Sequence, residues 1–296
     1  MLNDKLKNYL HLHLIVLIWG FTAVLGKLIS IDAIPLVWYR MLIASALVAV
    51  FILIKRNSIR VSTKTLIIML TAGVIIALHW VTFFKAIKVS NVSIALVTMS
   101  TGALFTAFLE PIWYGRRMIW YEVLFGLMVV FGLYLIFNVN TAYSLGMSLA
   151  LISALLGAIF TLINGQLIKT HKPSAIALYE LMSGVLFITF YLVMDGSFNR
   201  TFFILPLNDW FFIFILASVC TAYAFIAAIK VMRFISPYTV MLTINLEPVY
   251  GIILALLIFG QSEKMSPLFY VGALIIVATI IANGILKTRR KSSKGT

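Results

Sequence analysis

One phrase occurs twice in this chain, as FTAVLGKLI at Phe21–Ile29 and as FTLINGQLI at Phe160–Ile168. The two stretches share Phe, Thr, Gly, Leu and Ile at matching places, at an offset of 139 residues (160 − 21 = 139). A further pair, Gly115 and Gly260, has an offset of 145 (260 − 115 = 145). The similarity therefore extends along the chain, and we interpret the sequence as two copies of one unit.

The copies are predicted to be residues 1–140 and 141–296, joined in one integrated membrane domain. Each copy contains five apolar runs of about 20 residues, the length that crosses roughly 30 Å of hydrocarbon. The ten predicted spans are 11–29, 34–54, 65–84, 91–113, 118–137, 145–168, 174–194, 209–229, 236–259 and 267–286. These runs are continuous rather than alternating, so we expect an all-α polytopic membrane protein.

The composition agrees with a bilayer protein and excludes several other classes. The 296 residues are 62% hydrophobic and 11% charged, far from the usual composition of a soluble domain. The net charge of +14 does not indicate nucleic-acid binding, because Lys and Arg lie in short gaps between apolar runs rather than on one polar face. Cys220 is the single cysteine, which excludes an intrachain disulfide and a thiolate metal site. No metal or cofactor is expected.

Basic residues predict the orientation of the spans, because cytoplasmic loops are enriched in Lys and Arg. If the N-terminus is cytoplasmic, the opposite loops hold only Lys85, Lys88, Arg200 and Lys264 of the 23 basic residues. We therefore expect both termini in the cytoplasm, and the chain in the plasma (inner) membrane of a bacterium. Each copy has five spans, and an odd number of spans ends on the opposite side of the membrane from where it began. The second copy therefore enters the membrane from the opposite side, so the two repeats are inverted.

An inverted pair of units has two related shapes, one open to each side of the membrane, in which the halves exchange roles. This is the physical basis of alternating access in transporters. Some channels are also built from inverted repeats, so a channel or an uncoupled facilitator remains an alternative. The preference for a transporter rests on analogy between folds.

Two longer motifs extend this pattern, LIWGFTAVLGK at Leu17–Lys27 and NLEPVYGIILALLIFGQ at Asn245–Gln261. Together with the ten spans and two repeats, they resemble the EamA-type branch of the drug/metabolite transporter superfamily, over essentially the whole chain. The resemblance implies export or exchange of small metabolites such as amino acids through a central cavity between the repeats. Small four-helix relatives carry a proton-exchanging carboxylate in their first span, but span 11–29 has none here.

Glu247 is predicted near the middle of the ninth span, where a carboxylate costs about 2.5 to 3.5 kcal/mol. Pro248 follows it and should interrupt the helix, which frees the carbonyl of Ile244. Such a break is tolerated where the backbone is buried in protein or lines a wet cavity. We interpret Glu247 as a coupling or charge-balancing residue, and a neutral glutamic acid that only joins two helices is the alternative.

Arg40 and Glu180 occupy equivalent places in the two repeats (180 − 40 = 140). Arg40 could balance Glu247 or bind a carboxylated solute, and Glu180 is a second candidate for coupling. The alternative for Arg40 is that its long side chain reaches back to the membrane interface.

Glu110 precedes Pro111 as Glu247 precedes Pro248, but it is not the repeat partner of Glu247. The offset of 145 assigns that place to Gly102 (247 − 145 = 102). Glu110 should therefore lie nearer the cytoplasmic end of its span. We expect it to pair with Arg116 or Arg117 as a gate at the inner mouth.

Aromatic and amide side chains within the spans are candidates for a solute pocket. We predict that the pocket includes Trp19, His79, Trp80, Asn164, Tyr179, Tyr223 and Asn245. The alternative is ordinary helix packing for the aromatic residues, and a structural hydrogen bond for the histidine.

No nucleotide-binding loop, zinc-protease motif or nucleophile elbow occurs, so no catalytic residue is assigned and an enzyme is not expected. The resulting prediction is a secondary transporter, and more specifically an exporter of small metabolites. Its expected partners are a small-molecule solute, protons as a candidate coupling ion, and the lipid bilayer, without nucleic acid. A homodimer is compatible with this prediction. An intramembrane enzyme would require His79 and Glu247 to lie within hydrogen-bond reach.

Overall fold

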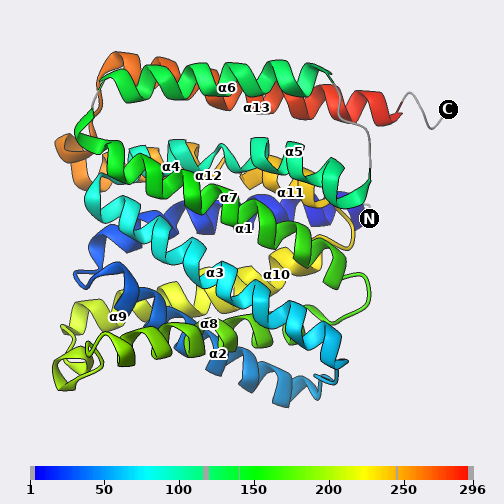
Figure 1. Cartoon of the computed structure of the whole chain (residues 1–296), viewed down its shortest axis with the longest axis vertical. Helices are drawn as coiled ribbons and strands as arrows, with labels where there is room; N and C mark the ends of the chain where they lie inside the picture. The colour runs from blue at the N-terminus through cyan, green and yellow to red at the C-terminus, as the bar shows by residue number, and fades with distance from the viewer. Residues whose placement is uncertain (1–3, 116–119, 140, 245, 293–296) are drawn as a thin grey trace.

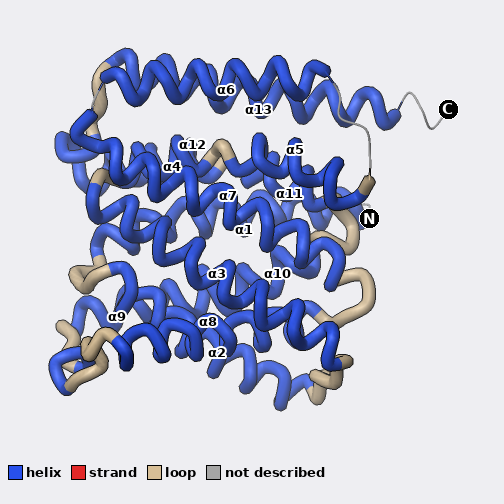
Figure 2. Tube along the Cα trace, viewed as in Figure 1, coloured by secondary structure: helices blue, strands red, loops and turns tan. Residues whose placement is uncertain are grey.

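A computed structural model describes residues 4–115, 120–139, 141–244 and 246–292. Within these ranges the regular structure is helical, without a strand (Figure 2). The first half consists of α1 (Asp4–Leu28), α2 (Ala33–Lys55), α3 (Thr63–Val89), α4 (Val92–Met99), α5 (Gly102–Tyr114) and α6 (Trp120–Val139). The second half consists of η1 (Thr141–Tyr143), α7 (Ser144–Leu167), α8 (Pro173–Met194), η2 (Arg200–Phe203), α9 (Leu207–Ala217), η3 (Ser218–Tyr223), α10 (Ala224–Val231), α11 (Pro237–Ile244), α12 (Glu247–Phe259), η4 (Gly260–Glu263) and α13 (Pro267–Ser292).

The two halves repeat one another so closely that equivalent helices begin at equivalent residues. Helices α4 and α5 begin at 92 and 102, and α11 and α12 begin at 237 and 247, each 145 residues later (237 − 92 = 145, 247 − 102 = 145). Equivalent helices run in opposite directions in Figure 1, where α1 ends at the side of the bundle at which α7 begins. The repeats are therefore inverted, as the sequence predicts.

Apolar helices make up most of this bundle, and large apolar side chains cover its surface. Among the described residues, seven helical stretches are long and apolar enough to cross a membrane, and two shorter apolar helices span Leu124–Ile136 and Pro267–Thr279. Such helices satisfy their backbone hydrogen bonds internally, which lipid requires. The chain is a multi-pass membrane protein.

Glycines allow the helices to cross at short distance. Helix α1 crosses α12 at Gly20 and Gly251, where a Cβ atom built on Gly251 would lie 3.1 Å from the Gly20 carbonyl oxygen. Helices α6 and α13 pack together at Gly132 and Gly272, where each Cβ would lie about 3 Å from the other residue's carbonyl oxygen. Small residues at such crossings are what membrane helix packing favours.

A closer contact joins α3 to α8 and supports a prediction. A Cβ atom on Gly73 would lie 2.3 Å from the carbonyl oxygen of Glu180, which is backbone and cannot move aside as a side chain can. We expect Gly73→Ala to cost about 1 to 3 kcal/mol of stability. The measurement is the thermal unfolding midpoint in detergent. The matched control is Gly126→Ala, whose Cβ would meet only the ends of the Phe108 and Leu104 side chains. Equal midpoints for the two variants would contradict the prediction.

The ninth predicted span is broken as expected from Pro248. Helix α11 ends at Ile244 and α12 begins at Glu247. The fourth predicted span, taken as continuous over 91–113, is interrupted at the equivalent place between α4 and α5. Here the hydroxyls of Ser100 and Thr101 donate to the carbonyls of Val97 and Thr98 at 2.6 and 2.8 Å, which competes with the helical hydrogen bonds.

Candidate functional site

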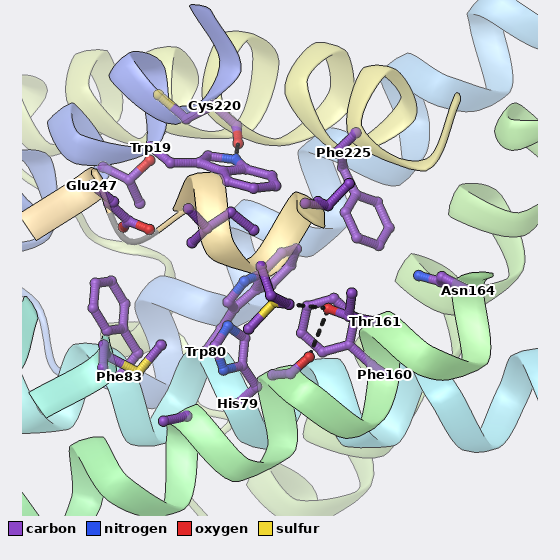
Figure 3. Close-up of a pocket in the computed structure, with 18 of the residues that line it drawn as sticks. Trp19, His79, Trp80, Phe83, Phe160, Thr161, Asn164, Cys220, Phe225 and Glu247 are labelled. Atoms are coloured by element: carbon purple, nitrogen blue, oxygen red, sulfur yellow. Dashed lines mark hydrogen bonds between the residues drawn. The ribbon is translucent and has the colours of Figure 1, made fainter. Parts of the chain in front are cut away.

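A cavity of about 100 Å³ is lined by residues of both repeats, and Figure 3 shows a close-up of it. A water occupies roughly 10 to 15 Å³ on this scale, so the space suits about seven to ten waters or a solute of amino-acid size. Five repeat-related pairs line it at offsets of 139 or 145 residues: Thr22 and Thr161, Trp80 and Phe225, Phe83 and Ala228, Leu96 and Met241, and Met99 and Ile244. Because both members of each pair face the same space, the cavity lies on the axis that relates the repeats.

Arg40 extends from α2 into this cavity and is almost completely buried, with 2% of its surface exposed. Its Nε donates to the Thr221 hydroxyl at 2.6 Å, and its Cζ lies 3.9 Å from the centre of the Trp80 ring. The Nη1 nitrogen has no hydrogen-bond partner within the described part of the chain. A guanidinium remains charged under physiological conditions, so the cavity contains a positive group with a free donor. This combination suits an anionic group such as a carboxylate.

A π-helix in the second half positions two of these contacts. The η3 segment follows α9, and its wider turns re-aim the local side chains and carbonyls. The Thr221 hydroxyl donates to the Leu216 carbonyl at 2.7 Å and accepts the bond from Arg40. The carbonyl of Cys220, in the same segment, accepts a bond from Trp19 Nε1 at 3.2 Å. The π-helix therefore fixes both the arginine and the indole at the cavity wall.

Glu247 is the first residue of α12 and lines the cavity beside Trp19 (Figure 3). Its position at a helix N-terminus is one that favours a negative charge. Arg40 attracts it electrostatically, but no ion pair within 4.0 Å joins the two in the described structure. The cavity thus holds a basic and an acidic side chain that do not form an ion pair with each other in the described structure.

His79 lies on the opposite wall of the cavity from Trp19 (Figure 3). Its Nδ1 lies 2.8 Å from the Ser153 carbonyl, and the Ser153 hydroxyl donates to the His79 carbonyl at 2.8 Å. Because a carbonyl only accepts, Nδ1 carries the hydrogen, and Nε2 is the acceptor of a neutral ring. No hydrogen bond joins His79 to Glu247 within the described ranges, so the pair that an intramembrane enzyme would require is not formed.

Several predicted pocket residues do line this cavity, namely Trp19, His79, Trp80 and Asn164. Asn164 also donates to Glu180 Oε2 at 3.3 Å, and Glu180 itself lies outside the lining with no exposed surface. The binding and coupling roles assigned to these residues remain predictions.

Two tyrosines predicted to line the pocket lie elsewhere. The Tyr179 hydroxyl donates to the Ile59 carbonyl at 3.0 Å, and the Tyr223 hydroxyl is 2.8 Å from His11 Nε2; both contacts are exposed. The rotation of each helix about its own axis directs these side chains away from the cavity. The sequence does not reveal this rotation.

The predicted inner gate is only partly described. Glu110 is buried on α5, whereas Arg116 and Arg117 lie outside the described residues, as does Asn245.

Phe225 and Met241 line the cavity but were not predicted to do so, and Thr221, which binds Arg40, was not predicted either. For Phe225 a signal was available, because it is the repeat partner of Trp80 (225 − 80 = 145). The two rings lie 6.0 Å apart across the axis. Thr161 was likewise present in the repeated phrase, opposite Thr22. The position of Thr221 depends on the π-helix, which had no signal in the sequence.

One end of the bundle is closed by a buried carboxylate. Glu263 in η4 accepts hydrogen bonds from the backbone nitrogens of Val92 and Ser93 at 3.1 and 3.0 Å, and from the Ser93 hydroxyl at 2.9 Å. Lys27 Nζ at the end of α1 forms an ion pair with it at 2.8 Å. We call these four residues the η4 clamp, and it ties the first repeat to the second.

A second buried contact lies at the same end. Asp209 accepts from the backbone nitrogen and the hydroxyl of Ser30 at 2.9 and 2.6 Å. It therefore holds the segment after α1.

The opposite end of the bundle has no equivalent of the η4 clamp in its sequence. The repeat partner of Lys27 is Gln166 (166 − 27 = 139), and the partner of Val92 is Pro237 (237 − 92 = 145), which has no N–H to donate. The contacts described there include an exposed bond from Arg233 to the His171 carbonyl at 2.9 Å and a partly buried bond from Asn57 to the Ser174 hydroxyl at 3.2 Å. The η4 clamp therefore has no repeat-related copy at that end.

Inverted repeats of apolar helices around a shared, charged cavity define a multi-pass membrane protein of the transporter type. The profile of the EamA-like transporter family matches residues 6–138 and again 144–285, and the chain belongs to this family. No curated protein matches the chain. Its fold is similar to a solved structure titled "Crystal structure of protein", with a TM-score of 0.70 and 15% identity over 96% of this chain and 98% of that chain.

Proposed function

We propose that this protein is a secondary transporter that exports small metabolites, amino acids among them, across the plasma membrane of a bacterium by alternating access. The observation that carries the proposal is the Nη1 of Arg40, which has no partner among the described residues, inside a cavity on the repeat axis. A charge buried at that depth is costly unless it serves a ligand or a partner. A carboxylated solute would supply the missing acceptor.

In this proposal the two halves, 1–140 and 141–296, form one membrane domain of ten spans with cytoplasmic termini. Broken helices α4–α5 and α11–α12 each count as one span, and α6 and α13 supply the fifth span of each half. The ends of α1 and α3 then face outward, so the η4 clamp closes the outer side. The lining residues Asn164 and Met232, near the ends of α7 and α10, extend the cavity toward the cytoplasm. The structure then corresponds to an inward-facing state.

An amino acid fits the chemistry of the cavity. Its carboxylate would bind Arg40, its ammonium group would lie toward Glu247, and its side chain would contact Trp19 and Trp80. Glu247 and Glu180 are the proposed coupling groups. Uncoupled exchange remains the second candidate, and a channel is disfavoured by the buried clamp at one end.

Glu247→Gln tests the proposed polarity of the site. We expect counterflow of a radiolabelled amino-acid mixture in proteoliposomes to fall about 10-fold or more, because a hydrogen bond to a charged group contributes roughly 1.5 to 3 kcal/mol. Uptake of the matching carboxylic acids, which lack the ammonium group, should change much less. An equal loss for both solute classes would contradict the assigned orientation. Absence of counterflow by the wild-type protein would contradict the proposed solute class.

A further inference from the structure

Glu180 is the repeat partner of Arg40, and the two residues differ in their access to the cavity. Each lies seven residues after the start of its helix, α2 or α8 (40 − 33 = 7, 180 − 173 = 7). Arg40 lines the cavity, whereas Glu180 is absent from the lining and completely buried. Among the described residues, the one hydrogen bond to its carboxyl group comes from Asn164 Nδ2 to Oε2 at 3.3 Å.

Two neighbouring acceptors in this pair are left without a donor. Glu180 Oε1 and Asn164 Oδ1 are both buried and have no hydrogen-bond partner among the residues that the structure describes. A carboxylate and an amide oxygen can only accept, so neither can satisfy the other. A single proton on Oε1 would give the pair the donor that it lacks, directed at Oδ1. Carboxylic acid and amide would then satisfy each other with one hydrogen bond in each direction.

The surroundings of Glu180 also favour the neutral acid. Helices α2, α3 and α10 pack against α8. Their lysines Lys55, Lys64, Lys85 and Lys230 are exposed, and the half-buried Lys88 donates to the Ile29 carbonyl. The buried titratable groups on these helices are Tyr39, Arg40 and His79, which bind Phe202, Thr221 and Ser153 respectively. No ion pair to Glu180 is present in the described part of the chain. An uncompensated carboxylate in such a place costs several kcal/mol.

We propose that Glu180 and Asn164 form a proton-binding site that is loaded in this conformation. The proton adds to Oε1 from a hydronium ion, which leaves as water, and no other bond changes. When the halves exchange roles, Glu180 takes the cavity-facing place that Arg40 has here, and it exchanges its proton with water on the outer side. Return to the inward-facing state then requires protonation. This inference rests on the proposed transport function for its role in coupling, but not for the site itself.

Asn164 links this site to the solute. Its side chain both lines the cavity and donates to Glu180. A solute that hydrogen-bonds to this amide therefore changes the environment of the proton. Proton binding and solute binding share one side chain, which is the physical requirement for coupling between two sites.

Infrared spectroscopy of the purified protein tests the site without any solute. At about neutral pH the wild-type protein should show the C=O absorption of a protonated buried carboxyl, which Glu180→Gln removes and which Asn164→Ala shifts in frequency. The matched control is Asp32→Asn, which alters an exposed carboxylate and should leave the band in place. An ordinary glutamic acid ionises near pH 4.3. A band that appears only below about that pH, or that persists in Glu180→Gln, would overturn the proposal.

Proteoliposomes to which a radiolabelled amino-acid mixture is added from outside test the coupling. The ratio of uptake driven by a pH gradient to uptake by counterflow should exceed one in the wild-type protein, fall to about one in Glu180→Gln, and remain at the wild-type value in Asp32→Asn. An unchanged ratio in Glu180→Gln would overturn the coupling role. If the wild-type protein shows no counterflow, the proposed function fails, and the infrared result still decides whether the proton site exists.

Discussion

Replacing Arg40 with methionine should reduce amino-acid counterflow at least about 30-fold while the protein still folds. The substitution removes the permanent positive charge of the cavity and leaves the Thr221 hydroxyl without its 2.6 Å partner. Truncating one member of a buried, hydrogen-bonded charged contact costs roughly 2 to 5 kcal/mol, and each 1.4 kcal/mol is tenfold in affinity. The loss should appear in solute affinity, which is measured by concentration dependence of counterflow.

Two further variants distinguish the effect of the Arg40 charge from the effect of its side-chain shape. Arg40→Lys retains the charge but loses the planar fork that reaches both Thr221 and the Trp80 face, so we expect an intermediate loss. Arg60→Met removes an exposed arginine in the loop before α3 and should have little effect. Equal activity of Arg40→Met and Arg60→Met, at equal thermal stability, would show that Arg40 does not bind solute.

Breaking the η4 clamp should shift the protein toward the outward-facing state. Glu263→Gln replaces an acceptor of four hydrogen bonds with an amide that cannot accept on its nitrogen, and it removes the ion pair with Lys27. Breaking a buried ion pair by removing one charge costs about 3 to 5 kcal/mol. This cost falls on the inward-facing state alone, because alternating access requires the clamp to be open in the other state.

The shift can be measured with a cysteine at Leu25, in a background where Cys220 is replaced with serine. Leu25 is buried here, but its repeat partner Asn164 lines the cavity (164 − 25 = 139), so exchange of the halves should expose position 25 to the outside. We expect a membrane-impermeant thiol reagent, applied from outside, to label this cysteine at least about 100-fold faster in Glu263→Gln, which corresponds to roughly 3 kcal/mol.

Asp32→Asn is again the matched control for this experiment. It breaks an ion pair with Lys85 that spans 3.9 Å at the same end of the bundle, and both side chains are exposed. Exposed pairs contribute about 0 to 1 kcal/mol, so the labelling rate should change little. If Glu263→Gln labels no faster than Asp32→Asn, the η4 clamp does not hold the outer end closed.

Much of the architecture could be predicted from the residues alone. Hydrophobic runs located the helices, and the offset between Gly115 and Gly260 predicted the repeat that the structure contains. The proline after Glu247 predicted a broken helix correctly. By contrast, the contact of Asp209 could not be read from the residues: it lies in the first turn of α9, which begins at Leu207, and it accepts hydrogen bonds from Ser30 across the bundle.

The cavity was only partly accessible to sequence reasoning. Trp19, His79, Trp80 and Asn164 were predicted to line a pocket and do line this cavity, whereas Tyr179 and Tyr223 do not. Polar or aromatic identity does not specify which face of a helix turns inward. The placement of Thr221 required the π-helix, which changes the direction of a side chain without leaving a mark in the hydrophobic pattern.

There is a physical reason why the sequence predicts the helices but not the contacts between their side chains. In lipid each span must satisfy its own backbone, so helices and their order are local properties that hydropathy and repeats record. The clamp joins Lys27 to Glu263 across 236 residues, and the proposed proton site joins α7 to α8 through two side chains. Those contacts depend on how helices rotate and cross at glycines such as Gly20 and Gly73. Only the tertiary structure decides them.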